Sequence, residues 1–267
     1  MTTTGMDLDR YCAELTAQTD SLRAHVEDKT LTTPVPTCPG WTLGDLVRHL
    51  GGAHRWAERI VRTRATGPVP DDQVNDVSGD DGASTAQLTA WLAEGAARLA
   101  DTLRAAGPDV PVWTVAPGGT PVFWARRMLG ETVVHRADAA GAVGADYTLD
   151  PAVALDGLDE WLEFSVLPQA FASREALRDL LAPGRTLHFH ATDAGPGAGE
   201  WLVDLTGDAP ARRRAHEKAA VAVRGPAAEL LLLMYQRQSV RGDGVEILGD
   251  TALFDLWRER VSAWLRR

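Results

Sequence analysis

The chain has 267 residues, of which 45% are hydrophobic and 24% charged, a balance typical of a globular protein that buries a sizeable core. This length exceeds one typical domain and favours two. The net charge of −10 argues against nucleic acid as a partner, and no apolar run reaches the roughly 18 residues that a membrane span needs.

Four amphipathic helices are predicted in the first half of the chain, because apolar residues recur there at helical spacing. Thr42, followed three residues later by Asp45, is typical of a capping box at a helix start. Pro121 suits the first turn of a helix. The connections are mostly short, which indicates an antiparallel four-helix bundle. The four helices are expected at about 7–27, 42–64, 85–106 and 121–142.

The second half changes its hydrophobic period and predicts a small α+β domain, a sheet packed with helices. Three arginines, Arg212–Arg214, are interpreted as a solvated helix or loop face. The expected fold is therefore mainly α with a smaller α+β domain, divided into domains 1–148 and 149–267. Helices are expected at 151–164, 226–238 and 251–266, and strands at 186–192, 200–206, 219–224 and 245–248.

The cysteines and the N-terminal sequence indicate the cellular compartment of the protein. Cys12 and Cys38 lack metal-type spacing, and a chain of this length does not depend on a disulfide. The N-terminus has no basic-then-apolar signal segment. We therefore expect a cytoplasmic protein.

Two stripes of side chains suggest a metal site. Glu131 and His135 are four residues apart and leave the same face of the fourth helix, in a stripe that also contains Trp124, Met128 and Asp138. His49 lies in a similar stripe on the second helix, with Thr42, Asp45, Gly52 and Trp56. If the stripes face each other, His49, Glu131 and His135 meet as three ligands, and one coordination position stays open as in catalytic zinc sites.

The competing interpretation is that His49 and His135 are partly buried polar residues and that Glu131 is a surface acid. The metal hypothesis is favoured because an unpaired carboxylate among apolar side chains is costly. Gly51 and Gly52 agree with it if space beside His49 is needed for a ligand, since glycine costs a helix about 1 kcal/mol. Asp45 either orients the ring of His49 as a hydrogen-bond acceptor or only caps the helix.

The surrounding sequence resembles the mycothiol-dependent maleylpyruvate isomerase family, which belongs to the DinB-like four-helix metalloprotein superfamily. Three segments carry the resemblance: Cys38-Pro-Gly-Trp-Thr-Leu-Gly-Asp-Leu-Val-Arg-His49-Leu, Gly130-Glu131-Thr-Val-Val-His135-Arg-Ala-Asp138 and Val223–Arg237. It covers nearly the whole chain. The resemblance implies that His49, Glu131 and His135 are the metal ligands and that the bundle is DinB-like.

The resemblance also implies an activity. The metal, zinc by preference, would present mycothiol as a thiolate. The thiolate would attack an electrophile in an S-transferase, or add reversibly to a maleylpyruvate-like substrate in a cis–trans isomerase. The expected partners are thus a small-molecule thiol and an electrophilic substrate, with no nucleic acid and no membrane, in a monomer or homodimer. The alternative is a non-catalytic, metal-stabilised protein that binds a small apolar ligand or a protein partner.

The isomerase hypothesis needs a cationic anchor for substrate carboxylates. The resemblance points to Arg237, with Arg241 as a weaker candidate. Tyr235 and Gln236 precede Arg237 where the family more often has Trp and Gly, a departure that concerns the substrate. The alternative role of Arg237 is that of an exposed cation near a helix C-terminus.

Other histidines give weaker signals. His188 and His190 share one side of a predicted strand and either bind a metal as a pair or are ordinary strand residues without further ligands. His54 is five residues from His49 on the same helix and is expected to face elsewhere.

Overall fold

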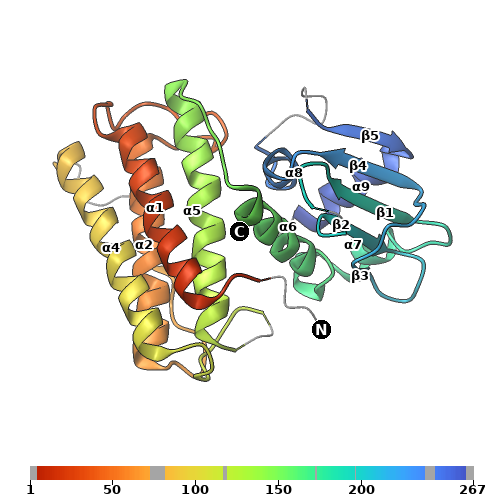
Figure 1. Cartoon of the computed structure of the whole chain (residues 1–267), viewed down its shortest axis with the longest axis horizontal. Helices are drawn as coiled ribbons and strands as arrows, with labels where there is room; N and C mark the ends of the chain where they lie inside the picture. The colour runs from red at the N-terminus through yellow and green to blue at the C-terminus, as the bar shows by residue number, and fades with distance from the viewer. Residues whose placement is uncertain are drawn as a thin grey trace. The chain divides into compact units, whose positions relative to one another are not determined.

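The structure, a computed structural model, describes residues 5–72, 82–116, 119–171, 173–195, 197–237 and 244–262. The chain divides into two compact units, Met1–Tyr147 and Thr148–Arg267. The first consists of long helices and the second of a small mixed sheet with helices (Figure 1). The expected fold class, mainly α with a smaller α+β part, is confirmed.

The first unit is the predicted four-helix bundle. Two of its helices, α1 and α2, each pack against both of the other two, α4 and α5, and Figure 1 shows the four lying side by side. Buried leucines and valines of α1, α2 and α4 and of the segment before α2 form its core. The helices span Leu8–Val26 (α1), Leu43–Thr63 (α2), Thr85–Ala106 (α4) and Pro121–Val143 (α5).

Local signals start and stop these helices as expected. The Thr42 hydroxyl accepts a hydrogen bond from the Asp45 backbone N–H, and the Asp45 carboxylate accepts one from the Thr42 N–H, which completes a capping box at α2. Pro121 occupies the first turn of α5, and Gly144 ends α5 in the left-handed conformation.

Helices α2 and α5 run antiparallel with their two stripes in contact. The ring centroids of His49 and His135 lie 5.1 Å apart, and those of Trp56 and Trp124 lie 5.0 Å apart. Along the shared interface, residue numbers therefore rise in α2 in the direction in which they fall in α5. This is the arrangement that the stripe hypothesis required.

The connector before α2 folds back on the bundle. Pro34 and Thr42 form an isolated antiparallel bridge, and the Val35 N–H donates to the Trp41 carbonyl at 2.9 Å. Cys38 and Trp41, at the end of this turn, pack against the apolar core. The connector thus holds Cys38 and Trp41 beside α2 and α5.

Glycine is required at position 51 by the packing of a neighbouring helix and not by a bound ligand. A Cβ added there would overlap the indole of Trp91, which belongs to α4. The expectation that Gly51 leaves space for a ligand beside His49 is therefore wrong. The missing side chain admits a tryptophan at the contact between α2 and α4.

The second unit has a five-stranded sheet in the order β3-β2-β1-β4-β5. The β1–β4 pair is parallel and the other pairs are antiparallel. Phe189 of β1 packs against Phe254 and Trp257 of α9, so one face of the sheet is apolar and covered. The elements are α6 (Pro151–Phe164), a 3-10 turn (Pro168–Ala170), α7 (Arg174–Arg178), β1 (Thr186–Ala191), β2 (Glu200–Asp204), β3 (Ala211–Arg213), β4 (Val221–Gly225), α8 (Ala227–Met234), β5 (Glu246–Gly249) and α9 (Thr251–Val261).

Two expectations for this unit are corrected. Arg212 is not on a solvated face, because it lies in the edge strand β3 and pairs with Asp159, at 2.8 Å, and with Glu163 of α6. Helix α8 ends at Met234, short of the predicted position 238, and the chain turns at Gln236 with a φ of 61°. Residue 238 and residues 263–267 of the predicted last helix lie outside the described part of the chain.

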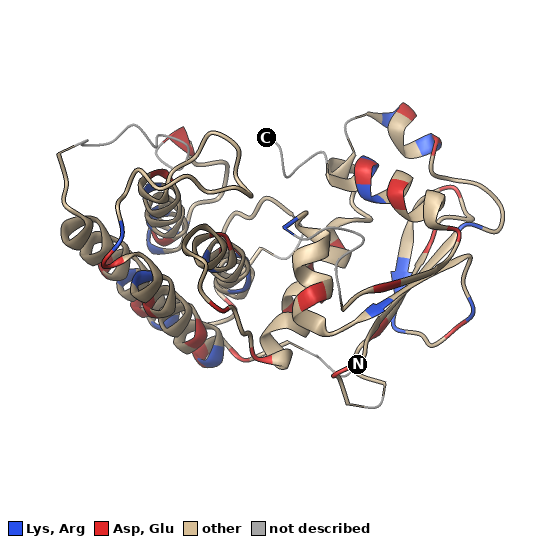
Figure 2. Ribbon diagram, turned by 90° about the horizontal axis from the view of Figure 1, so that it is seen from above, with Lys and Arg blue, Asp and Glu red and all other residues tan. Residues whose placement is uncertain are grey.

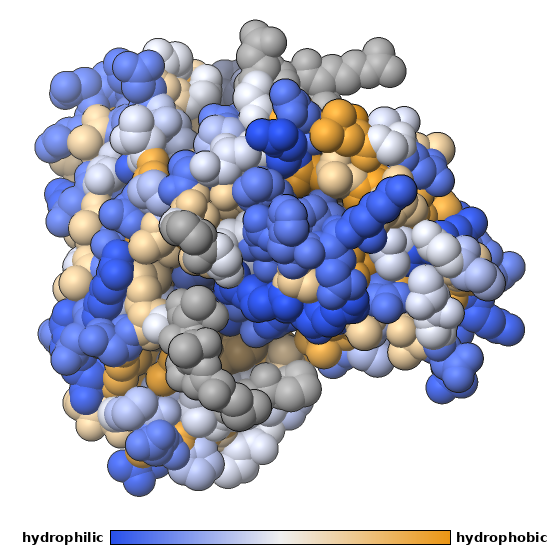
Figure 3. All heavy atoms as spheres, turned by 45° about the vertical axis from the view of Figure 1, so that its right-hand side comes forward, coloured by the Kyte–Doolittle hydropathy of each residue, from blue (hydrophilic) through white to orange (hydrophobic). Residues whose placement is uncertain are grey.

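The surfaces of the units are largely polar. Figure 2 shows Lys and Arg interspersed with Asp and Glu along the helices of the first unit. Hydrophilic side chains occupy most of the face in Figure 3, and among the described residues the exposed large apolar side chains are Val115 and Leu248. Among the described helices, none combines the length and the apolar character needed to cross a membrane.

The contact at Gly51 predicts an asymmetry between two glycine substitutions. Gly51→Ala should lower the free energy of unfolding by about 1–3 kcal/mol, because the methyl group overpacks against Trp91. Gly141→Ala is the matched control on α5, where an added Cβ meets nothing within 4 Å, and should raise it by about 0.5–1 kcal/mol. Urea unfolding measures both, and equal effects would contradict the packing account.

Candidate metal centre

The structure brings the three predicted ligands together. His49 extends from α2, and Glu131 and His135 extend from adjacent turns of α5. One potential ligand atom from each lies within 4.8 Å of the other two. The imidazole of His135 is buried, whereas His49 and Glu131 are partly exposed.

The spacing suits a metal ion better than a direct hydrogen bond. His135 Nε2 and Glu131 Oε2 are 3.5 Å apart, longer than the roughly 2.7–2.9 Å of a charge-assisted hydrogen bond. Zinc–ligand bonds of about 2.0–2.2 Å place the ligand atoms of a tetrahedral site roughly 3.3–3.6 Å apart. The two atoms therefore have a separation that an ion can bridge.

The two oxygens of the Glu131 carboxylate have different partners, because Arg127 binds only one of them. The Arg127 guanidinium is buried one turn before Glu131 and donates to Oε1, while Oε2 faces His135. Burial alone would raise the pKa of the Glu131 carboxyl, but Arg127 and then His135 hold it well below its ordinary value. Glu131 is therefore ionised, with one oxygen paired to Arg127 and the other directed at the candidate site.

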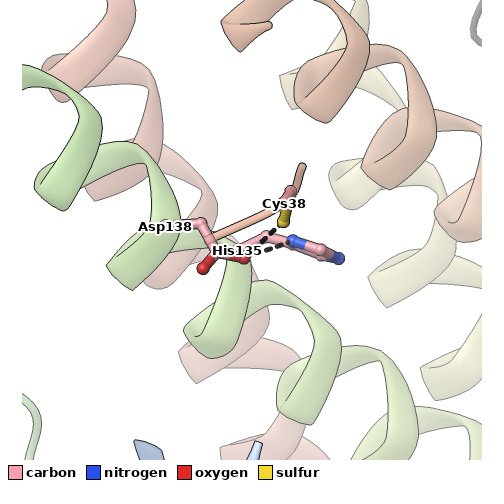
Figure 4. A group of neighbouring side chains, drawn as sticks. All are labelled: Cys38, His135 and Asp138. Atoms are coloured by element: carbon pink, nitrogen blue, oxygen red, sulfur yellow. Dashed lines mark hydrogen bonds and ion pairs between the residues drawn. The ribbon is translucent and has the colours of Figure 1, made fainter. Parts of the chain in front are cut away.

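Asp138 orients the ring of His135 from the next turn of α5. Its Oδ2 accepts a hydrogen bond from His135 Nδ1 at 2.9 Å and one from the Cys38 thiol at 3.4 Å, and its Oδ1 accepts one from the Thr37 hydroxyl at 2.6 Å. Figure 4 shows the other ring nitrogen of His135 directed away from Asp138 and Cys38. A proton fixed on Nδ1 leaves Nε2 as the ligand atom.

This orienting role was missed by the sequence reasoning. Asp138 was placed in the correct stripe, and its position three residues after His135 was the available signal. The structure instead directs Asp45, the residue considered for such a role, to its own helix end. Asp45 Oδ2 accepts from the Thr42 backbone and hydroxyl at 2.8 and 2.7 Å, and Oδ1 lies 3.5 Å from Arg48 Nη1.

The carboxylates around His135 set its protonation. Burial would lower the pKa of this imidazole, but the hydrogen bond to Asp138, together with the nearby Cys38 thiol and Glu131 carboxylate, holds the pKa well above its ordinary value. A metal ion at Nε2 must therefore displace a proton. Metal binding at this centre is expected to weaken as the pH falls.

Trp41 forms one side of the centre. Its ring centroid lies 4.9 Å from that of His49 and 6.1 Å from that of His135, and it stacks on the latter with an interplanar angle of 22°. An indole in this position limits the rotation of both imidazoles and covers them from water. Sequence reasoning gave Trp41 no role, since its loop position carries no helical periodicity.

Cys38, His135 and Asp138 form a second possible ligand group that shares His135. Cys38 is a free cysteine and already donates to Asp138. The two groups use opposite sides of the imidazole, because Asp138 takes Nδ1 and Glu131 faces Nε2. We interpret the Cys38 group as the support of His135.

His54 does not belong to the group of three ligands and contacts Thr132 of α5 instead. Its Nε2 lies 3.0 Å from the Thr132 hydroxyl, which itself donates to the Met128 carbonyl at 2.7 Å. A hydroxyl with its only proton committed can only accept, so Nε2 of His54 carries the proton. His54 is fully buried, and its Nδ1 has no hydrogen-bond partner within the described structure.

Arg237 lies in the second unit, just after α8. Its Nη1 donates to the Tyr235 carbonyl at 2.9 Å, and its side chain is partly exposed. It follows the end of the helix rather than belonging to its last turn. Arg241, the weaker candidate, lies outside the described residues.

Two family models match the chain in tandem. The model of the mycothiol maleylpyruvate isomerase N-terminal domain matches residues 12–140, and that of the MDMPI C-terminal domain matches residues 152–256. The fold and the centre define a two-unit protein whose helical bundle carries an imidazole–carboxylate cluster. The chain belongs to the mycothiol maleylpyruvate isomerase family.

Two solved structures share this fold. A crystal structure of the mycothiol-dependent maleylpyruvate isomerase has 16% sequence identity and a TM-score of 0.60, and the match covers 92% of this chain and 95% of that one. A histidine-to-alanine mutant of that enzyme matches with 15% identity and a TM-score of 0.59 over the same shares. No curated protein sequence matches the chain.

The buried His54 predicts a loss of stability in acid. Burial, with a contribution from Arg55, lowers the pKa of His54 to about 3, whereas in the unfolded chain it is about 6.5. Between these values the unfolded state binds a proton that the folded state does not. The free energy of unfolding should therefore decrease as the pH is lowered through this window, by up to about 1.4 kcal/mol per pH unit.

Urea unfolding of metal-free protein at several pH values between 4 and 6 measures this slope. The slope gives the number of protons taken up on unfolding, and His54→Leu should lower that number by close to one. His25→Leu is the control, because burial lowers the pKa of the partly exposed His25 less strongly. Identical slopes for the wild type and His54→Leu would contradict the assignment.

Proposed function

We propose that the protein is a metal-dependent enzyme that activates mycothiol for reaction with an electrophile. The convergence of His49, Glu131 and His135 within 4.8 Å carries the proposal. Membership of the mycothiol maleylpyruvate isomerase family supports it, as does the fold shared with an enzyme of that name. The cosubstrates are then two small molecules, a thiol and its electrophile.

The donor set fits a divalent first-row ion. Two imidazoles and one carboxylate are ligands that zinc accepts, and a set of three leaves a position for an exogenous ligand. Zinc is preferred, although neighbouring ions of the series also accept such a set. His135 Nε2 and Glu131 Oε2 are the atoms directed at the site. The thiol would occupy the open fourth coordination position.

The charges around the site favour an anionic thiol. Glu131 contributes one negative charge and the two imidazoles none, so a divalent ion leaves the site with a net positive charge. A bound divalent ion favours deprotonation of a coordinated thiol at neutral pH. Arg127 adds a buried positive charge beside Glu131, which further favours an anion here.

The residues of the chain have separate tasks in this scheme. Asp138 keeps the His135 ring in one orientation through Nδ1, and Trp41 stacks on that ring and limits its exposure to water. Arg127 holds the second oxygen of Glu131, so the carboxylate cannot turn away. Together they pre-organise the ligands before any substrate arrives.

The thiolate can then react in two ways. In S-transfer, the thiolate sulfur forms a C–S bond to the electrophilic carbon, the leaving group of the electrophile (chloride for monochlorobimane) departs with its bonding electron pair, and the thioether adduct is the product. In isomerisation, the thiolate adds to a cis double bond of a maleylpyruvate-like substrate, and the displaced electron pair moves onto the adjacent carbonyl. Rotation about the new single bond and loss of the thiolate restore the double bond as trans.

Isomerisation of a dicarboxylate also needs a cation to hold the substrate. We propose Arg237 for this task, because a guanidinium binds a carboxylate through two parallel hydrogen bonds. Its partly exposed side chain in the second unit is consistent with that task.

The metal assignment predicts that zinc is lost on removal of a ligand. His49→Ala and His135→Ala should each remove about one equivalent of tightly bound zinc, because two remaining ligands hold the ion poorly. Elemental analysis of the purified full-length variants measures this. His25→Ala, a histidine of α1 outside the cluster, is the control and should keep the zinc of the wild type.

The role of Asp138 extends the same experiment. Asp138→Asn keeps the size of the side chain and all three ligands, and it should weaken zinc binding by roughly 10- to 100-fold. Full retention of zinc in both alanine variants would disprove the ligand assignment. Unchanged affinity in Asp138→Asn would remove only the orienting role.

The thiol assignment predicts turnover that depends on mycothiol. The zinc-loaded protein should convert maleylpyruvate to its trans isomer, or form adducts with electrophiles such as monochlorobimane, only when mycothiol is present. Both reactions should be lost in His135→Ala. Product analysis by chromatography distinguishes them, and the absence of product with every substrate would favour the non-catalytic alternative.

Arg237 is tested by comparing a charged with a neutral substrate. Arg237→Gln should raise KM for the dicarboxylate by roughly 10- to 100-fold and leave a neutral electrophile unaffected, because only the former loses a charge-assisted hydrogen bond. Arg174→Gln, an exposed arginine of α7, is the matched control. A similar loss with both substrates would count against a carboxylate anchor.

A further inference from the structure

A second cluster of histidines lies on the sheet of the second unit. His188 and His190 are two residues apart on β1, so they share one face of the strand. Glu200 of β2 is the direct partner of His190 in the antiparallel register. His216, in the segment between β3 and β4, completes the group, which thus holds three of the seven histidines in the chain.

Glu200 is the centre of this cluster. His216 Nδ1 lies 2.6 Å from Glu200 Oε2, and His188 Nε2 lies 3.8 Å from the same oxygen. His190 Nε2 lies 3.6 Å from the other oxygen, Oε1. One potential ligand atom each from His188, Glu200 and His216 lies within 4.8 Å of the other two.

The cluster contains a buried polar atom without a partner. His188 as a whole is only 7% exposed, and its Nε2 has no hydrogen-bond partner among the described residues. The 3.8 Å between His188 Nε2 and Glu200 Oε2 is too long for a hydrogen bond, and a buried polar group left without a partner destabilises the fold. The separation is close to the roughly 3.3–3.6 Å between ligands of tetrahedral zinc.

The state of His188 also suits a ligand. Burial lowers the pKa of His188 further than Glu200 raises it, so the imidazole is neutral at neutral pH. A neutral imidazole can offer the lone pair of one ring nitrogen to a metal ion, and Nε2 is the buried nitrogen of His188 without a hydrogen-bond partner among the described residues.

Nearby cations are already paired with other carboxylates. Arg224, opposite His190 in the parallel register with β4, has its Nε 3.4 Å from Glu246 Oε2. Arg213 pairs with Glu217 at 2.6 Å and lies 3.7 Å from Asp204. Among the described residues, the ion pairs of the Glu200 carboxylate are therefore with imidazoles and not with a guanidinium group.

We propose that His188, Glu200 and His216 form a second site for a divalent first-row transition ion, with His190 beside it as a further donor. Imidazole and carboxylate ligands suit zinc and its neighbours in the series. An ion would satisfy the orphan nitrogen of His188 and replace the hydrogen bond between His216 and Glu200. It would join β1, β2 and the segment after β3.

The exposure of the ligands indicates how the ion enters. The side chain of His216 is 80% exposed and that of His190 34% exposed, whereas that of Glu200 is 16% exposed. The site is therefore fixed on the strands and open on the side of His216. Such a site exchanges its ion with solvent more readily than a buried one.

The test uses the full-length chain with the bundle ligands removed. The double variant His49→Ala, His135→Ala should still bind about one zinc ion, measured by titration against a chromophoric chelator, and Co²⁺ should give the visible absorption of a four-coordinate site. Adding Glu200→Gln or His216→Ala should weaken binding by more than about tenfold, since even supporting residues contribute that much. Adding His25→Ala is the matched control and should leave it unchanged.

Each outcome is decisive. Unchanged zinc affinity with both Glu200→Gln and His216→Ala would overturn the second site, as would no zinc binding by a folded double variant. His216→Ala alters an exposed side chain and Glu200→Gln preserves shape, so circular dichroism should show both folded. If the double variant does not fold, the same two substitutions in the wild-type chain should lower the zinc content from about two equivalents to about one.

Discussion

An ionised carboxylate held largely out of water sets the requirements that the first unit has to meet. Glu131 lies between α5 and α2 with its side chain 26% exposed, and such a group is costly without partners. Arg127 supplies one partner and His135 faces the other oxygen. His135 in turn needs Asp138, and Asp138 accepts from Thr37 and Cys38 of the connector. The docking of the connector and the geometry of the centre are therefore one network.

The parts of this network that lie within one helix could be predicted from the sequence. Glu131, His135 and Asp138 follow steps of four and three residues, and the helical period alone places them on one face. The capping box at Thr42 and the proline at the start of α5 are local in the same sense, and both were found as expected. Facing stripes on α2 and α5 followed from amphipathic packing in a bundle.

The parts that join distant segments could not be predicted in the same way. Thr37 and Cys38 reach Asp138 across about one hundred residues, through a connector whose turn has no periodic pattern. Gly51 was explained by a ligand, whereas Trp91 of α4 fills the space. Arg212 shows the same limit, because its partners Asp159 and Glu163 belong to a helix well before it in the chain. Side-chain contacts of this kind depend on tertiary structure, which overrides local preference.

The histidines of the sheet show how register adds information to a strand pattern. The sequence placed His188 and His190 on one side of a strand but gave them no further ligands, because period two says nothing about the neighbouring strand. Antiparallel pairing sets Glu200 opposite His190, and the chain after β3 returns His216 to the same carboxylate. The bundle cluster has ligands fixed by Arg127, Asp138 and Trp41, whereas the sheet cluster has one exposed and adjustable ligand. If both hold ions, the first is built to keep a ligand position constant through turnover, and the second to gain and lose its ion.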